Sequence, residues 1–350
     1  MPQMRHAPAH VQRSARPSLH FFFSSLFKMA RRGGPTLLIP LVLVLALLLV
    51  LACGVGAAAA ARRTGPRRVE RFDGAAQGTK KEEGVVEEVQ GTRYRIGVVD
   101  TGTGGVDVGE MGKCISLDGR MQLCEADAHR YHEMLVHFAV AYLGADRPPR
   151  RVLIVGGGDC LALREVLKYG TVERVVVLED EEKLPSVAEK HLLVNAHRTD
   201  PRVKWVHGNV AASAKKLAEG GSADQIRAYD VILLDCKARP GATPVTRAMC
   251  DDLLALLAVR GVVSSSCVGA SAALGAAFPY SVPYSFHSDT LDASVGMTVY
   301  SSFNIAAKPD DTPAAKGEVD VSFYEPSKHA GYLPWVLRAA GKVGGGVPRA

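Results

Sequence analysis

The sequence predicts an α/β fold in which a mostly parallel, doubly wound sheet follows a small antiparallel β unit. The first reason is that short apolar runs alternate regularly with amphipathic helical patterns after residue 150. The second is that the first of these runs, Val152–Val155, ends in three glycines and an aspartate. The third is that two alternating segments, 93–102 and 113–125, come earlier and end in turn residues.

The N-terminal 69 residues differ in charge from the rest of the chain. Ten of the 42 lysines and arginines lie there, and the first acidic residue is Glu70. The remaining 32 basic residues face 36 acidic ones, so the body is slightly acidic and does not indicate nucleic-acid binding. We therefore assign residues 1–35 to a basic tail.

Residues 36–61 contain no charge, and 26 such residues are long enough for a transmembrane helix. This predicts membrane localisation through a single-pass N-terminal anchor. A cleaved signal and an organelle transit peptide remain alternatives, so the protein could instead be organelle-targeted or secreted after cleavage. Basic residues flank the segment on both sides, so its orientation is not determined. Residues 62–84 are interpreted as a linker.

Two domains are expected after the linker. Residues 85–146 form the small β domain with one helix over 128–144, and Pro148-Pro149 marks the boundary. Residues 147–310 form the parallel-sheet domain, and residues 311–350 form a C-terminal segment and tail. In the parallel-sheet domain we expect strands at 152–156, 174–179, 203–208, 229–235, 261–268 and 297–306. We expect helices at 160–169, 185–196, 210–218 and 246–258.

The seven cysteines are scattered, odd in number and contain no C-x-x-C pair. This pattern suggests neither a disulfide framework nor a zinc site. We expect buried free thiols and no metal.

Polar residues at the carboxyl ends of the strands are the candidate site, because ligands of such sheets bind there. These positions are Gly156, Gly157, Gly158 and Asp159 on the glycine turn, and Glu179, Asn209 and Asp235 after later strands. The turn lacks the third glycine of a dinucleotide motif, and Asp159 would repel a pyrophosphate. A cationic sulfonium nucleoside removes both objections, because Asp159 can accept from an amino group and Glu179 can bind ribose hydroxyls.

The segments 117–134, 152–179 and 229–235 together resemble the polyamine aminopropyltransferase (spermidine synthase) family, over roughly residues 85–305. The resemblance implies a Rossmann-like S-adenosylmethionine-dependent-transferase fold, and transfer of an aminopropyl group from decarboxylated S-adenosylmethionine to a putrescine-like amine. It also implies possible homo-oligomers. Asp235 matches the general base and an amine contact, and Tyr131 a further amine contact. His132 and Asp159 match the aminopropyl side, Glu179 the ribose contact, and Gln122 a neighbouring cofactor residue. Asn209 aligns with a family aspartate at the adenine.

Several positions depart from the family pattern. A second carboxylate is replaced by Ala238, between Lys237 and Arg239. Two family glutamines align with Arg95 and Ser266, and a tyrosine that contacts the amine aligns with Thr290. The sequence therefore keeps the nucleoside half of the site better than the amine half. Alternative functions are a non-catalytic, membrane-tethered member that binds an adenosine ligand, or an S-adenosylmethionine-dependent methyltransferase.

Overall fold

A computed structural model describes eleven segments of the chain, at residues 84–102, 111–144, 146–192, 197–220, 227–235, 245–267, 270–290, 293–304, 306–307, 309–334 and 347–348. The chain divides into two compact units, Met1–Asp73 and Gly74–Ala350, and all described residues belong to the second. The predicted tail 1–35, the predicted span 36–61 and almost all of the linker 62–84 lie outside them.

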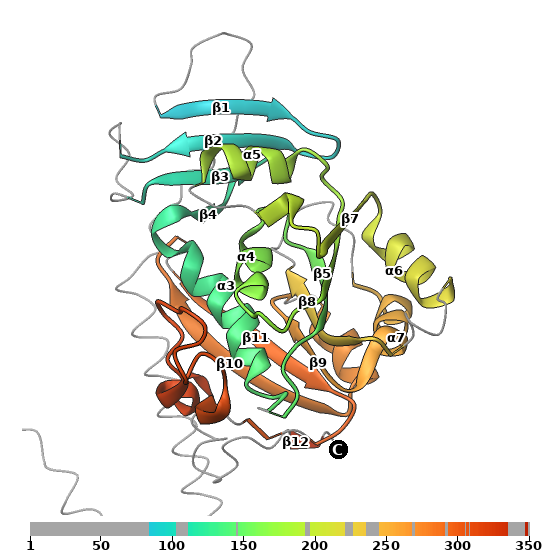
Figure 1. Ribbon diagram of the computed structural model, residues 1–350. Helices are drawn as coiled ribbons and strands as arrows, with labels where there is room; N and C mark the ends of the chain where they lie inside the picture. The colour runs from blue at the N-terminus through green and yellow to red at the C-terminus, as the bar shows by residue number, and fades with distance from the viewer. Residues whose placement is uncertain are drawn as a thin grey trace, which may run out of the picture. The chain divides into compact units, whose positions relative to one another are not determined.

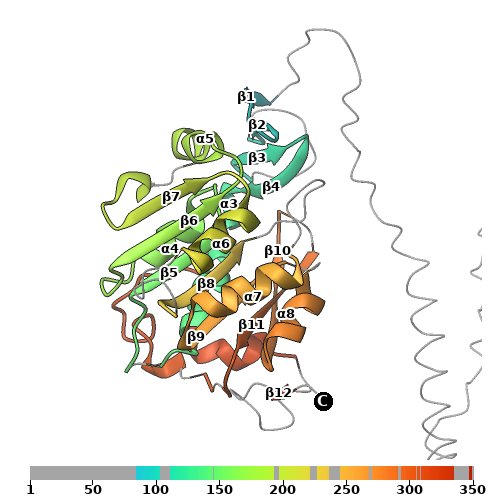
Figure 2. The same ribbon diagram turned by 90° about the vertical axis from the view of Figure 1, so that its right-hand side faces the viewer.

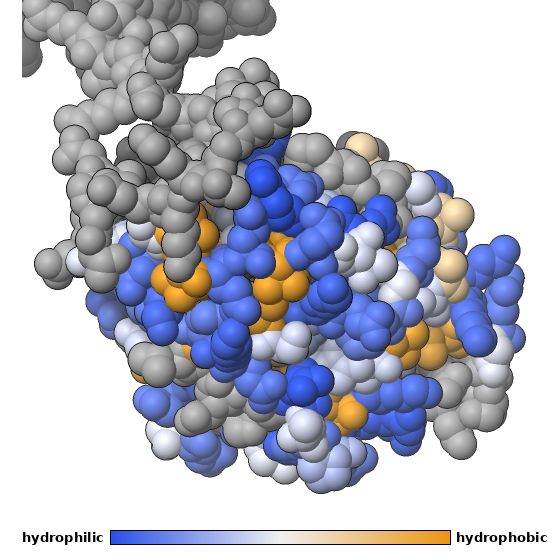
Figure 3. Space-filling view, turned by 90° about the horizontal axis from the view of Figure 1, so that it is seen from above, coloured by the Kyte–Doolittle hydropathy of each residue, from blue (hydrophilic) through white to orange (hydrophobic). Residues whose placement is uncertain are grey.

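The predicted membrane localisation is contradicted. Among the described helices, none is long and apolar enough to cross a bilayer. The charge-free run that suggested an anchor falls in residues 36–61, which the structure does not describe. The face shown in Figure 3 carries mostly hydrophilic side chains, with separate apolar patches between them.

Four antiparallel strands form the small sheet. They are β1 (Val85–Gln90), β2 (Arg95–Asp100), β3 (Lys113–Leu117) and β4 (Arg120–Cys124), in the order β1-β2-β3-β4. Asp118 and Gly119, both with positive φ, make the β3–β4 turn. Helix α3 (Glu125–Val140) begins directly after β4, so the residues at the end of the sheet lead into the helix that carries Tyr131 and His132.

The large sheet has eight strands in the order β12-β10-β11-β9-β8-β5-β6-β7. Its five parallel strands are β5 (Arg151–Gly156), β6 (Arg174–Glu179), β7 (Val203–His207), β8 (Tyr229–Asp235) and β9 (Leu257–Ser265). Strands β10 (Tyr280–Ser288), β11 (Ala293–Ser301) and β12 (Val347–Pro348) extend it with antiparallel pairings. The predicted α/β class, with a small antiparallel sheet in front, is confirmed.

Helices cover both faces of the large sheet (Figures 1 and 2). Alternate residues of the buried strands supply the two cores: Val152 and Ile154 of β5 pack with α3 and α4 (Leu161–Leu167). Leu153 and Val155 pack on the other face, where α6, α7 and α8 contribute. The bounds are Val210–Glu219 for α6, Arg247–Leu256 for α7, Ser271–Ala277 for α8, and Leu184–His191 for α5, which packs on the small sheet. Short 3-10 helices span His197–Thr199, Pro309–Asp311 and Pro326–Tyr332.

The sequence did not predict strand β10. Pro283 interrupts the pattern of this segment, and a proline has no N–H to donate to a neighbouring strand. In the structure Pro283 pairs with Thr298 of β11, and alternate residues Val282, Tyr284 and Phe286 are buried. The alternation of buried residues was the available signal.

The expectation of free thiols is wrong for three cysteines. Cys114 and Cys124 are disulfide-bonded, and Cys267 is disulfide-bonded as well. The register of β3 against β4 places Cys114 and Cys124 directly opposite each other, with Cα atoms 4.0 Å apart. Spacing in the sequence does not reveal such a register. Cys160 and Cys250 are buried free thiols, as expected.

Candidate active site

The glycine turn between β5 and α4 lies against two neighbouring strand ends. Gly156 has φ +83°, and a Cβ there would lie 2.5 Å from the main-chain oxygen of Asp235. Gly158 donates its N–H to Glu179 Oε2 at 2.8 Å, and a Cβ there would lie 2.7 Å from that same oxygen. Both positions therefore require glycine, because the turn packs directly on backbone and carboxylate.

This packing brings three carboxylates together at the carboxyl edge of the parallel strands. Gly156 of β5 is in register with Asp235, the last residue of β8, and Glu179 ends β6. Asp159, Glu179 and Asp235 are all at least 95% buried. Three buried carboxylates are costly unless hydrogen bonds or cations compensate them. Their hydrogen-bond partners therefore show which of them are already compensated.

Glu179 is held by the backbone. Its Oε2 accepts from Gly158, and its Oε1 accepts from the N–H of Glu181 at 2.9 Å. A carboxylate oxygen can accept more than one hydrogen bond, so the predicted ribose contact remains open to it. The bonds fix the orientation of the carboxylate in advance.

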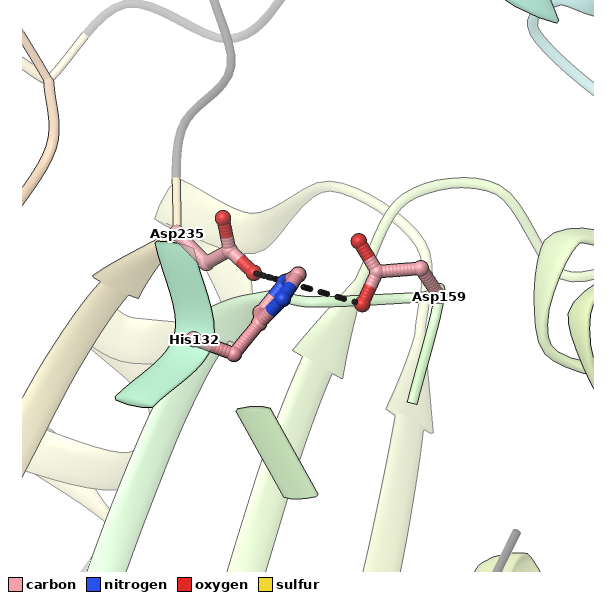
Figure 4. Close-up of side chains that lie close together, drawn as sticks. All are labelled: His132, Asp159 and Asp235. Carbon is pink, nitrogen blue, oxygen red and sulfur yellow. Dashed lines mark ion pairs between the residues drawn. The ribbon is translucent and has the colours of Figure 1, made fainter. Parts of the chain in front are cut away.

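His132, Asp159 and Asp235 form a buried cluster (Figure 4). His132 Nε2 lies 3.4 Å from Asp159 Oδ1 and 3.7 Å from Asp235 Oδ2. On the other side of the ring, His132 Nδ1 lies 2.5 Å from the carbonyl oxygen of Ala128, one turn back on α3. A carbonyl can only accept, so Nδ1 carries a proton and Nε2 faces the two carboxylates.

Two atoms of this cluster are buried without a hydrogen-bond partner in the described part of the chain. They are His132 Nε2 and Asp235 Oδ2. Unpaired buried polar atoms are uncommon, because each forfeits its hydration. One imidazole between two carboxylates leaves the cluster with excess negative charge, so it suits a cationic group with several N–H donors. The ligand atoms lie within 4.8 Å of one another, so the same three residues could also hold a metal ion.

Tyr131 connects Asp235 to Ser266. The Tyr131 hydroxyl donates to Asp235 Oδ1 at 2.9 Å and lies 2.6 Å from Ser266 Oγ. Burial and the Asp235 carboxylate raise the pKa of Tyr131 well above its usual value, so the hydroxyl keeps its proton. The structure thus brings together Tyr131, His132, Asp159, Asp235, Glu179 and the three glycines.

The two other predicted site residues show local roles. Asn209 is exposed and begins α6, where its Oδ1 accepts from the N–H of Ala212 at 2.9 Å. The cap uses one lone pair of this oxygen, so the second lone pair and the side-chain NH₂ remain for a ligand. Gln122 Nε2 donates to Arg120 O at 3.0 Å, while its Oε1 is buried without a hydrogen-bond partner among the described residues.

The divergent position Thr290 is tied to another residue. Asp127 accepts hydrogen bonds from the Thr290 N–H at 2.9 Å, from the Thr290 hydroxyl, and from Ser288 Oγ at 2.8 Å. These bonds lower the pKa of Asp127 although burial opposes them. Thr290 therefore fixes the end of β10 to α3.

Sequence reasoning missed two carboxylates next to site residues that bind the backbone of other segments. Glu133, beside His132, accepts from the N–H groups of Ser322, Phe323 and Tyr324. Glu181 accepts from the N–H groups of Thr92, Arg93 and Tyr94 and so ties the β1–β2 turn to the large sheet. The position of Glu133 next to His132 and Tyr131 was the available signal.

Comparison with known proteins agrees with this geometry. The family model described as "Spermine/spermidine synthase domain" matches residues 128–266. These residues, about two fifths of the chain, are similar to that domain. The predicted resemblance is confirmed, and the matched range contains Tyr131, His132, Asp159 and Asp235.

Two curated relatives are named polyamine aminopropyltransferases. The one from Aeropyrum pernix is 39% identical over 145 residues, which cover 41% of this chain and 43% of the relative. "Polyamine aminopropyltransferase 2" of Hyperthermus butylicus is 32% identical over 170 residues, 46% of this chain and 50% of the relative. The matches thus span half or less of these relatives.

Two solved structures share the fold. A spermidine synthase crystallised with the transition-state analogue AdoDATO superposes with a TM-score of 0.60 at 25% identity, covering 74% of this chain and 89% of that one. Spermidine synthase from Thermotoga maritima gives 0.59 at 24% identity, covering 74% and 88%.

Proposed function

We propose that this chain transfers an aminopropyl group from decarboxylated S-adenosylmethionine to an amine, with Asp235 as the general base. The observation that carries the proposal is the buried Asp235 Oδ2, which has no hydrogen-bond partner among the described residues. Its other oxygen is held by Tyr131 at 2.9 Å. The carboxylate is therefore oriented, with one oxygen left to accept a proton.

The chemistry requires such a base because a primary amine is protonated at neutral pH. The ammonium loses a proton to Asp235, and the nitrogen lone pair then attacks the carbon next to the sulfonium. The C–N bond forms as the C–S bond breaks, and the electron pair moves to sulfur, which leaves as neutral methylthioadenosine. No further reactant is needed.

The neighbouring groups divide the binding work. In this proposal His132 and Asp159 bind the amino group of the aminopropyl chain, which the short distances from His132 Nε2 to Asp159 and Asp235 support. Glu179 and the glycine turn bind the ribose. Intact S-adenosylmethionine carries an additional carboxylate, which Asp159 and Asp235 would repel at close range. The charges therefore favour the decarboxylated form over a methyltransferase cofactor.

Product formation tests the proposal. The full chain is incubated with decarboxylated S-adenosylmethionine and a panel of primary amines, and release of methylthioadenosine is measured beside a reaction with S-adenosylmethionine. We expect release with the decarboxylated form only. Asp235→Asn should reduce turnover by about a thousandfold, whereas Asp251→Asn, at an exposed carboxylate on α7, should not change it.

Three outcomes would contradict the proposal. Full turnover in Asp235→Asn would show that Asp235 is not the general base. Methyl transfer from S-adenosylmethionine would favour the methyltransferase alternative. Binding of methylthioadenosine without transfer to any amine would favour a non-catalytic, nucleoside-binding member. The hydrogen bonds from Thr290 to Asp127 support this alternative.

The domain boundaries at 85–146 and 147–310, and homo-oligomer formation, stay predictions.

A further inference from the structure

Ser266 is linked to the proposed general base through one intervening hydroxyl. It directly follows the last residue of β9 and is 9% exposed. Its Oγ lies 2.6 Å from the Tyr131 hydroxyl, which donates to Asp235 Oδ1 at 2.9 Å. The Ser266 hydroxyl itself donates to the carbonyl oxygen of Leu234 at 3.2 Å. These oxygen atoms form a chain that runs from the backbone of β8 to the carboxylate of Asp235.

The Tyr131 hydroxyl has one proton and, among the described residues, two acceptors for it. The proton of Ser266 is engaged with the Leu234 carbonyl, so Ser266 Oγ presents a lone pair to Tyr131. An ionised carboxylate accepts a stronger hydrogen bond than a hydroxyl oxygen does, so Tyr131 donates to Asp235 while Asp235 is ionised. Once Asp235 has taken a proton from the amine, its charge is gone, and Ser266 Oγ becomes the better acceptor.

A second serine of the same strand shows what is particular to Ser266. Ser264 lies two residues earlier, is fully buried, and has its Oγ 3.1 Å from the Tyr284 hydroxyl. Tyr284 donates to the carbonyl oxygen of Met134 at 3.0 Å. Both serines therefore contact a tyrosine hydroxyl that also bonds to another oxygen. The carbonyl oxygen keeps its charge throughout, whereas the Asp235 carboxylate loses its charge in the proposed reaction.

We propose that Ser266 is a positioning residue for the proton transfer, which accepts the Tyr131 hydrogen bond after Asp235 has taken the proton from the amine. This inference rests on the proposed aminopropyl transfer. The N–H bond of the ammonium breaks, its electron pair stays on nitrogen, and an O–H bond forms at Asp235 Oδ2. Tyr131 and Ser266 keep their own protons. Because the Tyr131 hydroxyl has a good acceptor before and after the transfer, protonation of Asp235 costs less.

Substitution of Ser266 should slow the chemical step and spare binding. Transfer is measured in a single turnover with decarboxylated S-adenosylmethionine and either butan-1-amine or 1,4-diaminobutane. Ser266→Ala should lower the rate at saturating amine about fivefold to tenfold with both acceptors, because one hydrogen bond is lost. The half-saturating amine concentration and the affinity for decarboxylated S-adenosylmethionine should not change. Ser266→Thr retains the hydroxyl and should restore most of the rate.

Two further variants separate this role from a structural one. Ser264→Ala removes the matched buried hydroxyl and should leave the rate unchanged. Tyr131→Phe removes the shared proton, so Ser266→Ala added to it should lower the rate no further. Thermal unfolding of each variant shows whether it is folded.

An unchanged rate in Ser266→Ala, an equal loss in Ser264→Ala, or additive losses in the variant that combines Ser266→Ala with Tyr131→Phe would overturn the inference. The proposed function would stand in each of these cases. Absence of transfer by the unaltered chain to every amine of the panel would overturn both.

Discussion

Two histidines of helix α3, His132 and His137, show how this fold treats a buried imidazole beside a carboxylate. Both are at most 1% exposed. His137 has both ring nitrogens bonded, Nδ1 with the Tyr169 hydroxyl at 2.7 Å and Nε2 with Glu165 Oε2 at 2.9 Å. His132 bonds only through Nδ1, and its Nε2 faces two carboxylates at longer distances.

The clusters around His137 and His132 also differ in charge balance. Glu165 also pairs with Arg164 at 2.8 Å and with Lys168 at 2.6 Å. Burial alone would raise the pKa of Glu165, but the bonds from His137 and Lys168 lower it to about 2. Around His132, the other donors to the carboxylates are neutral: Asp159 Oδ1 accepts from the N–H of Leu161 at 3.0 Å, and Asp235 Oδ1 accepts from the Tyr131 hydroxyl. The first cluster therefore holds helices α3 and α4 together, whereas under the proposed function the second cluster binds a cationic ligand.

The largest expected effect is a difference in stability between variants of the two clusters. Glu165→Gln should lower the free energy of unfolding by about 3 kcal/mol, because it removes one partner of a buried, paired charge. Asp159→Asn, the matched change in the other cluster, should alter it by less than about 1 kcal/mol, because it relieves repulsion between buried carboxylates. Urea denaturation at pH 7 measures both. Equal destabilisation by the two variants would abolish the distinction.

The pH dependence of stability gives the next effect, through a third buried histidine whose hydrogen-bond partners among the described residues are neutral. His329 bonds with the hydroxyls of Tyr324 and Tyr142, and burial lowers its pKa from 6.5 to about 4. Between pH 6.5 and 4 the unfolded chain binds a proton that the folded chain excludes. The free energy of unfolding should therefore fall as pH falls through this window, by about 3 kcal/mol.

Denaturation between pH 7 and 4 checks this expectation. His329→Phe preserves an aromatic ring against Phe138, where the stack is 4.0 Å between centroids, and should flatten the pH dependence. His287→Phe, at an exposed position on β10, should leave the dependence as it is. An unchanged slope in His329→Phe would show that another group is responsible.

The smallest effect concerns binding. His132→Asn should weaken binding of decarboxylated S-adenosylmethionine about tenfold through loss of a contact to a charged amino group. It should lower the unfolding midpoint only slightly, since the asparagine amide can still donate to the carbonyl of Ala128 and Nε2 has no hydrogen bond to lose within the described part of the chain. Calorimetric titration and thermal unfolding of the same preparation measure both. A large loss of stability with unchanged binding would assign His132 to the core.

Prediction from sequence worked where chemistry is local to a strand end. The glycine turn, Asp159, Glu179 and Asp235 follow directly from apolar runs that end in polar residues, and parallel strands bring their carboxyl ends together. Tyr131 and His132 were found only through the family resemblance. Their position depends on how α3 packs on the sheet, and local sequence patterns do not predict this packing.

The failures involve register and competition for hydrogen bonds. The pairing of Cys114 with Cys124 depends on which residues of β3 and β4 stand opposite each other. The hydrogen bond from the N-terminus of α6 to the Asn209 oxygen was not predicted either. The Ser266–Tyr131 contact joins residues 135 positions apart, and only the folded chain shows it.

The central claim is that His132, Asp159 and Asp235 together bind the cationic amino group of the aminopropyl chain. Calorimetric comparison of methylthioadenosine with decarboxylated S-adenosylmethionine tests it most directly, because the aminopropyl chain distinguishes them. The account predicts that the decarboxylated form binds at least about tenfold more tightly, and that Asp159→Asn removes most of that difference. Equal affinity of the two nucleosides for the unaltered chain would contradict it.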